Sequence, residues 1–579
     1  MSIKDSAFFP IVEQSINELM SIIHGSPKGL VFSYPDLHHN WFERFFAFID
    51  LKSLSPQFIP FDKLKGSSEN GNIFIFVPND SLEIKNAIKI ISSIPNYTKK
   101  LIIYPIIGFM VQKLIDESNI KEFCEIIEFH LDLLAIESYM YIVSSHRCFR
   151  RVFIEGDLED LSAISKALVK IESLNGAIPN ITCIGENSIR VQSLMSEMKS
   201  KIGLGAFGAE PVFDTLIIID RTVDLLTPLL TQFTYNGIID ETLESSFGII
   251  DLPEGCFYDK NRIVLSDQDE VFHDIRGLSI ADAGTMVLQN VKEIGIVGSS
   301  LSADMKKEFS KNQILKAKSL ADRKPLFSLH LGILEFVSAL NMQSKYFQPL
   351  IRFELECLLG ENPSINLLNE LMKFDMMWKE QIRYYCIMSM VNDGVGLTQL
   401  SSFRKRLVAK YGQEIILEII NMKKAGFMYS SKQNTMFGQK ENTFREIVNT
   451  FTLLPQDQTE QTRKLFGKED VGSFYDGYVP LTTRIIQSVL NGDIQKGPKN
   501  ELLKRLNIPL LFQKTNIPAR VSPIKTVMVF VIGGMTSSEA ISIREMGKAL
   551  FQGSIEFVIG TTSLTNSKKF LSDAFPLLK

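Results

Sequence analysis

The carboxylates Asp220, Asp224, Asp240 and Glu241 lie close together in the sequence, at the end of an apolar run and shortly after it. Paired carboxylates can act as general acid and base when their surroundings separate their pKa values. The alternative is structural, because Asp220 and Arg221 stand at the end of a predicted strand, where their charges can pair within the turn that follows. We favour the structural alternative over a catalytic pair.

Two glycine-rich stretches could hold phosphate. GLGAFG (Gly203–Gly208) matches GxGxxG, but it follows a predicted helix and precedes a strand, the reverse of a dinucleotide site. Gly533 and Gly534 are better placed, since they follow a strand and a helix begins near Thr536 or Ser537. No lysine of a P-loop follows them. We interpret the first stretch as a linker and the second as a strand-to-helix turn, with a Rossmann-like nucleotide-binding enzyme as the competing hypothesis.

Metal and nucleophile chemistry have weaker signals. The seven histidines form no HExxH motif, and His38 and His39 beside Asp36 are adjacent side chains that rarely converge on one ion. The six cysteines are scattered without CxxC, which argues against a zinc ribbon or a disulfide framework and is typical of reduced thiols in the cytosol. No GxSxG elbow is present.

Composition limits the class of protein. A chain of 579 residues exceeds the size of one hydrophobic core, so two to four domains are expected. The net charge of −4 argues against bulk nucleic-acid binding. The most apolar stretch, Leu101–Val111, is shorter than the roughly 20 residues that span a bilayer, and neither a signal peptide nor a lipidation motif is recognisable. We therefore expect any membrane contact to be indirect.

The order of the elements indicates an α/β protein. Apolar runs at Gly29–Tyr34, Asn72–Pro78 and Lys100–Pro105 alternate with helical patterns, which predicts a parallel sheet covered on both faces. Ser81 is the expected N-cap of the second of these helices. Cys148–Asp157 is expected to end in a strand and a turn.

Long helical patterns dominate from Thr242 to Asp470, which indicates a large, mostly helical insertion. Strand patterns return at Thr526–Gly534 and Ser554–Ser563. The simplest assembly adds them to the sheet that contains Phe213–Arg221. The predicted fold class is thus α/β, with two parallel-sheet domains and an inserted helical domain.

The segment Asp220–Glu241, DRTVDLLTPLLTQFTYNGIIDE, closely resembles the signature of the Sec-one/Munc-eighteen (SM) family, whose members bind SNARE proteins. We call it the signature segment. A strand-ending Asp-Arg, a hydrophobic residue with Asp, a Thr-Pro pair and a Tyr before an acidic pair match the family pattern at Asp220, Arg221, Val223, Asp224, Thr227, Pro228, Tyr235, Asp240 and Glu241. Pro228 would fix one path from the sheet into the helical insertion, and Tyr235 would pack its ring while its hydroxyl finds a partner.

Further segments are similar to the vacuolar protein-sorting branch of this family, which supplies the SM subunit of the HOPS and CORVET tethering complexes. The similar segments are Phe153–Gly185, Asn421–Met428, Phe474–Gln487, Met528–Glu545 and Glu556–Ser567. Before Arg150 mainly the rhythm of strands and helices agrees. An SM protein of plasma-membrane or Golgi fusion is the alternative within the family.

The resemblance implies an arch of three domains: residues 1–136, residues 137–241 with 471–579, and residues 242–470. Domains 1 and 3 would flank a cleft that holds one Qa-type and one R-type SNARE in register, and the chain would act as a template rather than an enzyme. The resemblance implies no catalytic residue, no cofactor, no metal and no nucleic acid. It implies a cytoplasmic protein recruited peripherally to endosomal and vacuolar or lysosomal membranes.

The resemblance also places two binding surfaces. A projecting hairpin is expected within Asp282–Lys324, and charge reversal at Lys306 and Lys307 is expected to weaken SNARE binding, unless both lysines are merely solvated. A helical-solenoid subunit resembling vacuolar protein-sorting protein sixteen would dock on Phe403–Ile419 and bring the other HOPS or CORVET subunits with it. Arg404, Gln413 and Ile416 hold the positions of expected contacts, although Gln413 departs from the expected aromatic residue.

Overall fold

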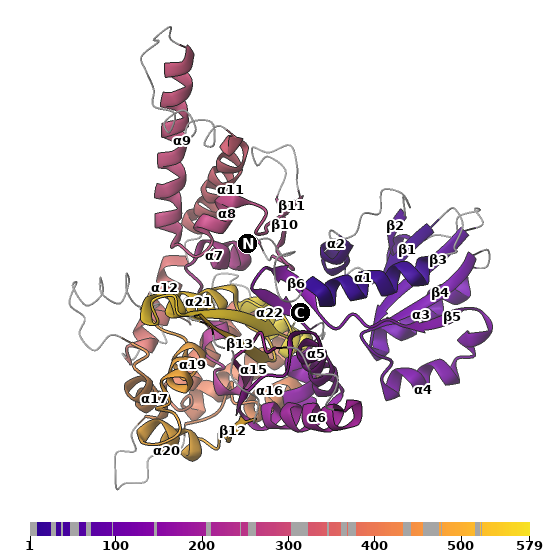
Figure 1. Cartoon of the computed structure of the whole chain (residues 1–579). Coiled ribbons are helices and arrows are strands. Elements are labelled where there is room, and N and C mark those ends of the chain that lie inside the picture. The colour runs from indigo at the N-terminus through magenta and orange to yellow at the C-terminus, as the bar shows by residue number, and fades with distance from the viewer. Residues whose placement is uncertain are drawn as a thin grey trace.

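Figure 1 presents a computed structural model of the chain, in which the N-terminal sheet stands to one side of a larger body that contains the second sheet and most of the helices. The structure describes residues 9–24, 30–35, 39–46, 57–64, 71–94, 97–143, 147–203, 210–243, 245–252, 262–302, 322–343, 347–360, 368, 378–431, 442–454, 474–475, 477–515, 522 and 524–578.

The N-terminal sheet has five parallel strands in the order β2-β1-β3-β4-β5. Its central strands are almost completely buried because helices cover both faces, as expected for strands that read as continuous apolar runs. The strands are β1 (Leu30–Tyr34), β2 (Gln57–Pro60), β3 (Gly71–Pro78), β4 (Tyr97–Tyr104) and β5 (Glu125–Glu128), and the helices are α1 (Phe9–Ile23), α2 (His39–Phe46), α3 (Ser81–Ser93) and α4 (Phe109–Glu117).

The second sheet joins segments that are far apart in the sequence. Its seven strands follow the order β12-β8-β9-β13-β14-β7-β6, with β12 antiparallel to β8 and β6 antiparallel to β7. The predicted return of the C-terminal segment is confirmed, because β13 pairs in parallel with β9 and places Ile532 opposite Asp220. The strands are β6 (Leu134–Glu137), β7 (Met140–Ile142), β8 (Asn180–Ile184), β9 (Thr215–Asp220), β12 (Leu510–Lys514), β13 (Lys525–Ile532) and β14 (Ile555–Thr561).

The chain segments that form the second sheet also contain α-helices. Those of the first segment are α5 (Glu159–Asn175) and α6 (Glu186–Ile202), and those of the C-terminal segment are α19 (Leu481–Asn491), α20 (Pro498–Arg505), α21 (Ser537–Leu550) and α22 (Ser567–Ala574). Strand β6 carries the chain across residue 136 into the second sheet. The domain boundaries at residues 136, 241 and 470 stay predictions.

The segment between the two halves of this sheet is mostly helical. It contains α7 (Tyr235–Leu243), α8 (Glu270–Ile275), α9 (Ile280–Ser302), α11 (Lys324–Gln343), α12 (Phe347–Leu358), α14 (Trp378–Val391), α15 (Leu397–Tyr411), α16 (Ile415–Lys424) and α17 (Thr443–Phe451). A short antiparallel ribbon, β10 (Ile249–Asp251) with β11 (Arg262–Val264), lies near its start. Helix α9 projects from the body of the molecule, and α11 packs against it (Figure 1).

Two local predictions are wrong. Arg150–Glu155 forms a π-helical turn and not a strand. The prediction failed because buried Val152 and Ile154 repeat with the two-residue period that is typical of a strand. The N-cap of α3 is Asp80 rather than Ser81, since the Asp80 carboxylate accepts hydrogen bonds from the amides of Leu82 and Glu83.

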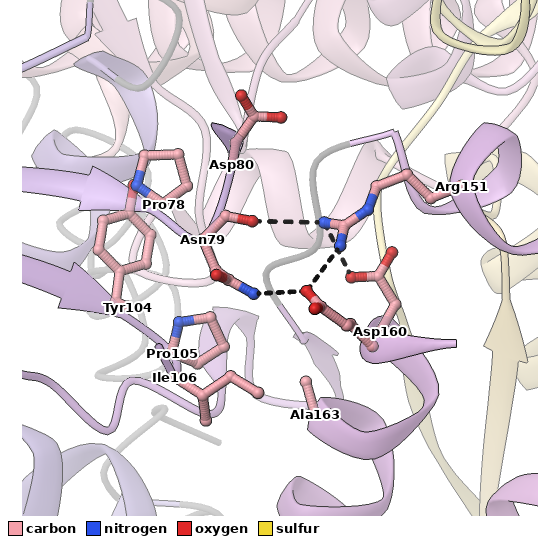
Figure 2. Close-up of a pocket in the computed structure, with 10 residues that line it drawn as sticks. Pro78, Asn79, Asp80, Tyr104, Pro105, Ile106, Arg151, Asp160 and Ala163 are labelled. Carbon is pink, nitrogen blue, oxygen red and sulfur yellow. Dashed lines mark hydrogen bonds and ion pairs between the residues drawn. The ribbon is translucent and has the colours of Figure 1, made fainter. Parts of the chain in front are cut away.

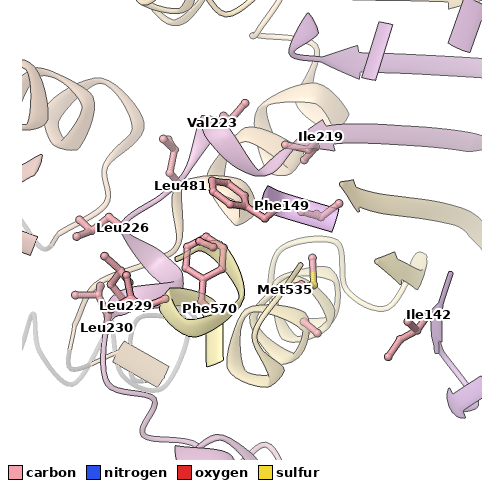
Figure 3. Close-up of a cluster of buried hydrophobic side chains, with 14 of the residues drawn as sticks. Ile142, Phe149, Ile219, Val223, Leu226, Leu229, Leu230, Leu481, Met535 and Phe570 are labelled. Carbon is pink, nitrogen blue, oxygen red and sulfur yellow. The ribbon is translucent and has the colours of Figure 1, made fainter. Parts of the chain in front are cut away.

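A hydrophobic core surrounds the signature segment and joins it to distant helices (Figure 3). Val223, Leu226 and Leu229 belong to this core. The ring of Phe149 lies 5.0 Å from that of Phe570 on α22, in an edge-to-face arrangement. The core therefore fixes the signature segment between the second sheet and the C-terminal helices.

Among the described residues, no helix is long and apolar enough to cross a membrane.

Candidate functional site

Arg221, the second residue of the signature segment, is fully buried beside two carboxylates. Its Nη1 donates to both carboxylate oxygens of Glu539, at 3.0 and 2.8 Å, and its Nη2 lies 3.6 Å from Asp224. Burial raises the pKa of Glu539, and the Arg221 guanidinium partly offsets that effect. Glu539 also accepts a hydrogen bond from the Thr482 hydroxyl. The pair joins the end of β9 to the first turn of α21.

Asp224 shapes the turn that follows the sheet. Its Oδ1 accepts from the amide of Thr227 at 3.0 Å, and its Oδ2 accepts from the Thr227 hydroxyl at 2.6 Å. Pro228 then occupies the 3-10 turn Thr227–Leu229, where its fixed φ is compatible with the first helical positions. The chain thus leaves the sheet along one path, as the resemblance implies.

Asp220 is bound to a different element. Its carboxylate accepts from the amides of Asn187 and Ser188, at 2.9 and 2.7 Å, in the first turn of α6. This position suits a carboxylate, because the N-terminus of a helix carries a partial positive charge. Burial raises the pKa of Asp220 to about 7, although these two amides oppose the shift. A side chain at Gly185, whose φ is +116°, would collide with the carboxylate.

The hypothesis of a catalytic carboxylate pair finds no support in this geometry. Asp220 and Asp224 are 2% and 3% exposed, and each is hydrogen-bonded to a different part of the protein. A raised pKa is common in active sites, but here burial explains it. The two groups do not share a position from which one substrate could be reached.

Tyr235 connects the signature segment to the projecting helices. Its hydroxyl lies 2.8 Å from Nδ1 of His330 on α11, and Nε2 of His330 lies 2.9 Å from Asp269, the N-cap of α8. His330 is fully buried, and burial also raises the pKa of Tyr235 well above its ordinary value. These two hydrogen bonds of His330 connect α7, α8 and α11.

The acidic pair at the end of the signature segment contacts the C-terminal helix. Glu241 accepts from the amide and the hydroxyl of Ser567, at 3.2 and 2.8 Å. The side chain of Asn566 donates to the carbonyl of Asp240 at 3.0 Å. Signature residues thereby bond to α6, α11, α21 and α22, which are the contacts that a structural junction requires.

The turn at Gly533 and Gly534 leaves little for a phosphate to bind. The amide of Gly533 donates to the Thr562 hydroxyl at 3.0 Å, and the amide of Ser538 donates to Gln232 at 3.0 Å. Thr536 caps α21 in a capping box with Glu539. Because these donors are engaged within the protein, the competing hypothesis of a nucleotide site loses its backbone cradle. In the other glycine-rich stretch, residues 204–208 lie outside the described residues.

A small pocket lies where the N-terminal sheet meets α5 (Figure 2). Arg151 reaches into it and contacts Asp157 at 2.9 Å, Asp160 at 3.3 Å and Glu159 at 3.5 Å. Asn79 at the end of β3 donates to Glu159 at 3.2 Å. The guanidinium is already neutralised by carboxylates, so this arrangement ties two parts of the chain together rather than presenting a charge to an anion.

The predicted partner-docking residues lie on one helix-turn-helix. Arg404 is on α15, Gln413 is exposed in the turn, and Ile416 is 44% exposed on α16. Leu417 and Ile420 on α16 are 65% and 54% exposed. We call Ile416, Leu417 and Ile420 the α16 apolar patch. Contiguous apolar exposure of this kind is typical of an interaction surface.

The predicted SNARE-binding residues Lys306 and Lys307 lie outside the described residues, between α9 and α11. The first arm of the expected hairpin, residues 283–296, lies within α9. Asp36 and His38, and the side chain of His39, are also outside the described part, within which no three His, Cys, Asp or Glu side chains could hold a metal ion.

Sequence reasoning missed several residues that complete the junction. Glu539 and His330 are far from the signature segment in the sequence, and Gln232 lies inside it but belongs to no motif that indicates its contact with the amide of Ser538. Glu354 of α12 likewise accepts from the amide and hydroxyl of Thr231, at 2.9 and 2.7 Å, and pairs with Arg383. The spacing of Thr536 and Glu539 could have been recognised as a capping box, but it predicts a helix start and not a bond to Arg221.

Comparisons with known proteins agree on one family. A family model described as the Sec1 family matches residues 83–573. Vacuolar protein sorting-associated protein 33A of Rattus norvegicus is 26% identical over 493 residues, which cover 79% of this chain and 78% of that protein.

Two solved structures share the fold over almost the whole chain. The SM protein Vps45 in complex with the Qa SNARE Tlg2 superposes with a TM-score of 0.59 at 16% identity, covering 98% of each chain. The Unc18–syntaxin 1 complex from Monosiga brevicollis gives a TM-score of 0.60 at 13% identity, covering 98% of this chain and 99% of that one. At these identities the likeness concerns the fold alone.

Proposed function

The chain belongs to the Sec1 family, and from that premise we propose that it regulates SNARE-mediated membrane fusion on the route to endosomes and to vacuoles or lysosomes. The resemblance found in the signature segment and the three-domain SM fold are both confirmed. The observation that carries the proposal is the family match over residues 83–573, because it includes the whole second sheet, the helical insertion, and strands β4 and β5 of the N-terminal sheet. Relatives named for vacuolar protein sorting support the endosomal and vacuolar route.

The proposed mechanism is templating. The N-terminal sheet on one side and α9 with α11 on the other would flank the SNARE helices, and each amphipathic helix would contribute an apolar stripe to the complex. Holding a Qa-type and an R-type SNARE together lowers the entropic cost of starting their association. SM proteins in solved complexes with Qa SNAREs support the choice of partner. No covalent step is needed, and the buried, internally bonded carboxylates of the junction suit a scaffold.

The second proposed partner is the helical-solenoid subunit of a HOPS-like or CORVET-like complex, bound at the α16 apolar patch. Its side chains are exposed, while Ile415, Ile419 and Met422 bury the opposite face of the helix. Lys423 and Lys424 at the end of α16 are exposed and would favour an acidic rim on the partner. Membrane contact would then be indirect, through the other subunits.

Affinity purification of the tagged full chain from its own cells, with identification of the co-purifying proteins, tests this proposal. We expect SNAREs of the endosomal and vacuolar route together with a helical-solenoid subunit and β-propeller subunits. SNAREs of the plasma membrane or the Golgi, without those subunits, would contradict the endolysosomal assignment.

A further inference from the structure

A cluster of charged groups around a buried tyrosine lies where three segments of the chain meet. We call Glu137, Tyr139, Asp267, Arg276 and Arg544 the Arg276 cluster. Arg276, the C-cap of α8, donates from Nη1 to Glu137 at the end of β6 and to Asp267 in the loop before α8. The three side chains are 3% to 6% exposed. The amide of Ser138 donates to the other oxygen of Asp267 at 2.6 Å.

Tyr139, in the turn between β6 and β7, faces two guanidinium groups. Arg276 lies 4.9 Å and Arg544 of α21 lies 3.6 Å from the centre of its ring, within range of cation–π attraction. Burial raises the pKa of Tyr139, and Glu137 adds to this effect while the two arginines oppose it. The cluster therefore connects the second sheet, α21 and α8.

Helix α2 of the N-terminal part reaches the same place. Arg44 donates to the carbonyl of Ile136 on β6. Burial lowers the pKa of Arg44, while Glu137 and Asp267 oppose that shift, so its guanidinium lies in their field. Next to it on α2, Glu43 accepts from Arg262 of β11 at 2.7 Å. The Arg44 bond thus holds α2 to β6 of the second sheet, and the pair of Glu43 with Arg262 holds α2 to β11 at the start of the helical insertion.

The other end of α8 is also fixed, by the bond of its N-cap Asp269 to His330 on α11. Helix α8 packs against α11, and α11 packs against α9. Helix α8 has only six residues and is bonded at both ends, so a change in its orientation would also move α11, which packs against it. Its orientation should therefore govern the direction in which α9 projects.

We propose that Arg276 is a positioning residue that fixes the projecting helices α9 and α11 relative to the N-terminal sheet. The effect on SNARE binding rests on the proposed function, since the distance between the N-terminal sheet and the helices α9 and α11 is the width of the proposed cleft. Removal of this guanidinium leaves Glu137 and Asp267 buried beside each other without the cation that contacts both of them. The two carboxylates then repel or take up water, and the segments that carry them separate.

Distance measurement between two spin labels tests the positioning role. One label is placed at Lys113→Cys on α4 and the other at Lys292→Cys on α9, both at exposed positions, in a full chain with Cys124 and Cys256 replaced by Ser. We expect Arg276→Gln to shift or broaden the distance distribution. An unchanged distribution would overturn the proposal. If Arg276→Gln does not fold, Arg276→Lys is measured instead. Lysine keeps the charge but not the geometry of the two contacts, so we expect a smaller shift in the same direction, and an unchanged distribution would again overturn the proposal.

Arg323→Gln is the matched control. Arg323 bonds to Asp274 at 2.6 Å and to Glu270 at 3.3 Å, so its contacts stay within the α8–α11 unit. We expect Arg323→Gln to leave the distance distribution between the two labels unchanged. A shift as large as that of Arg276→Gln would show that Arg276 has no specific positioning role.

Titration of a Qa-type SNARE motif separates this inference from the proposed function. Arg276→Gln should weaken binding by about tenfold, a typical size for coupling between distant sites. If the unmodified chain binds no SNARE, the proposed function is refuted. The positioning role is then still tested by the distance measurement. A changed distance with unchanged affinity would overturn the link between cleft width and binding.

Discussion

Arg221 and Glu539 have the features that an active site often shows, because both are charged, fully buried and directly bonded. They lie 318 positions apart, and each belongs to an element that the other helps to place. Breaking a buried ion pair is costly, although forming one gains little net stability, so such a pair acts mainly on which segments come together. We therefore assign the pair to assembly of the junction.

Glu539→Gln should destabilise the protein strongly, since it leaves the Arg221 charge buried with only Asp224 nearby, at 3.6 Å. The expected loss is about 3 kcal/mol of unfolding free energy. Thermal unfolding of the full chain, followed by circular dichroism, measures it. Glu545→Gln on the same helix is the control, because the pair of Glu545 with Lys548 is exposed and should contribute less than about 1 kcal/mol. Equal midpoints for the two variants would contradict the role given to Arg221.

At the scale of elements, the sequence predicted most of the strands and helices that carry strong patterns. The runs at Leu30–Tyr34, Gly71–Pro78 and Lys525–Ile532 are fully or largely apolar, and strands buried on both faces must be so. The π-helical turn at Arg150–Glu155 was missed because its buried side chains repeat every second residue. Bonds such as Tyr235 to His330 could not be predicted, since they depend on the tertiary arrangement rather than on local pattern.

Helices α15 and α16 show that the location of an exposed surface and the identity of its partner are separate questions. The sequence resemblance named Arg404, Gln413 and Ile416, and the structure adds the neighbours Leu417 and Ile420, which are exposed on the same short helix. Helical spacing brings residues three and four positions apart onto one face, which explains why Ile416 and Ile420 belong to one patch. Their assignment to the solenoid subunit stays a proposal.

The double variant Gln413→Asp with Ile416→Lys should fold normally and lose the solenoid subunit. Both side chains are exposed, so the substitutions cost little in the free chain, whereas they place charges in an apolar contact. Co-purification with the subunit and the melting temperature of the free variant are the two measurements. Leu397→Lys, at a 55% exposed position on α15 outside the patch, should retain the partner. Full retention by the double variant would rule out this docking surface.

At the scale of the whole molecule, distant segments of the chain are fastened to one another at a few buried polar clusters. The junction around Arg221 holds the second sheet to the C-terminal helices, Arg151 holds the N-terminal sheet to α5, and the Arg276 cluster lies where α2, the second sheet and the helical insertion meet. The proposed template role requires such fastening, because a loosely held partner would not lower the entropic cost of association. The signature segment resembles that of the family, yet its side chains are mostly buried, so we expect binding on other surfaces.

The central claim is that the chain holds two SNAREs at once, and calorimetric titration tests it most directly. A Qa-type SNARE motif is titrated into the full chain, and an R-type motif is then titrated with and without the first. We predict that both bind, that the R-type motif binds more tightly when the Qa-type motif is present, and that Lys306→Glu with Lys307→Glu weakens binding by about tenfold, as two ion pairs of about 0.5–1 kcal/mol each would give. Absence of binding by the unmodified chain, or no gain in R-type affinity in the presence of the Qa-type motif, would contradict the account.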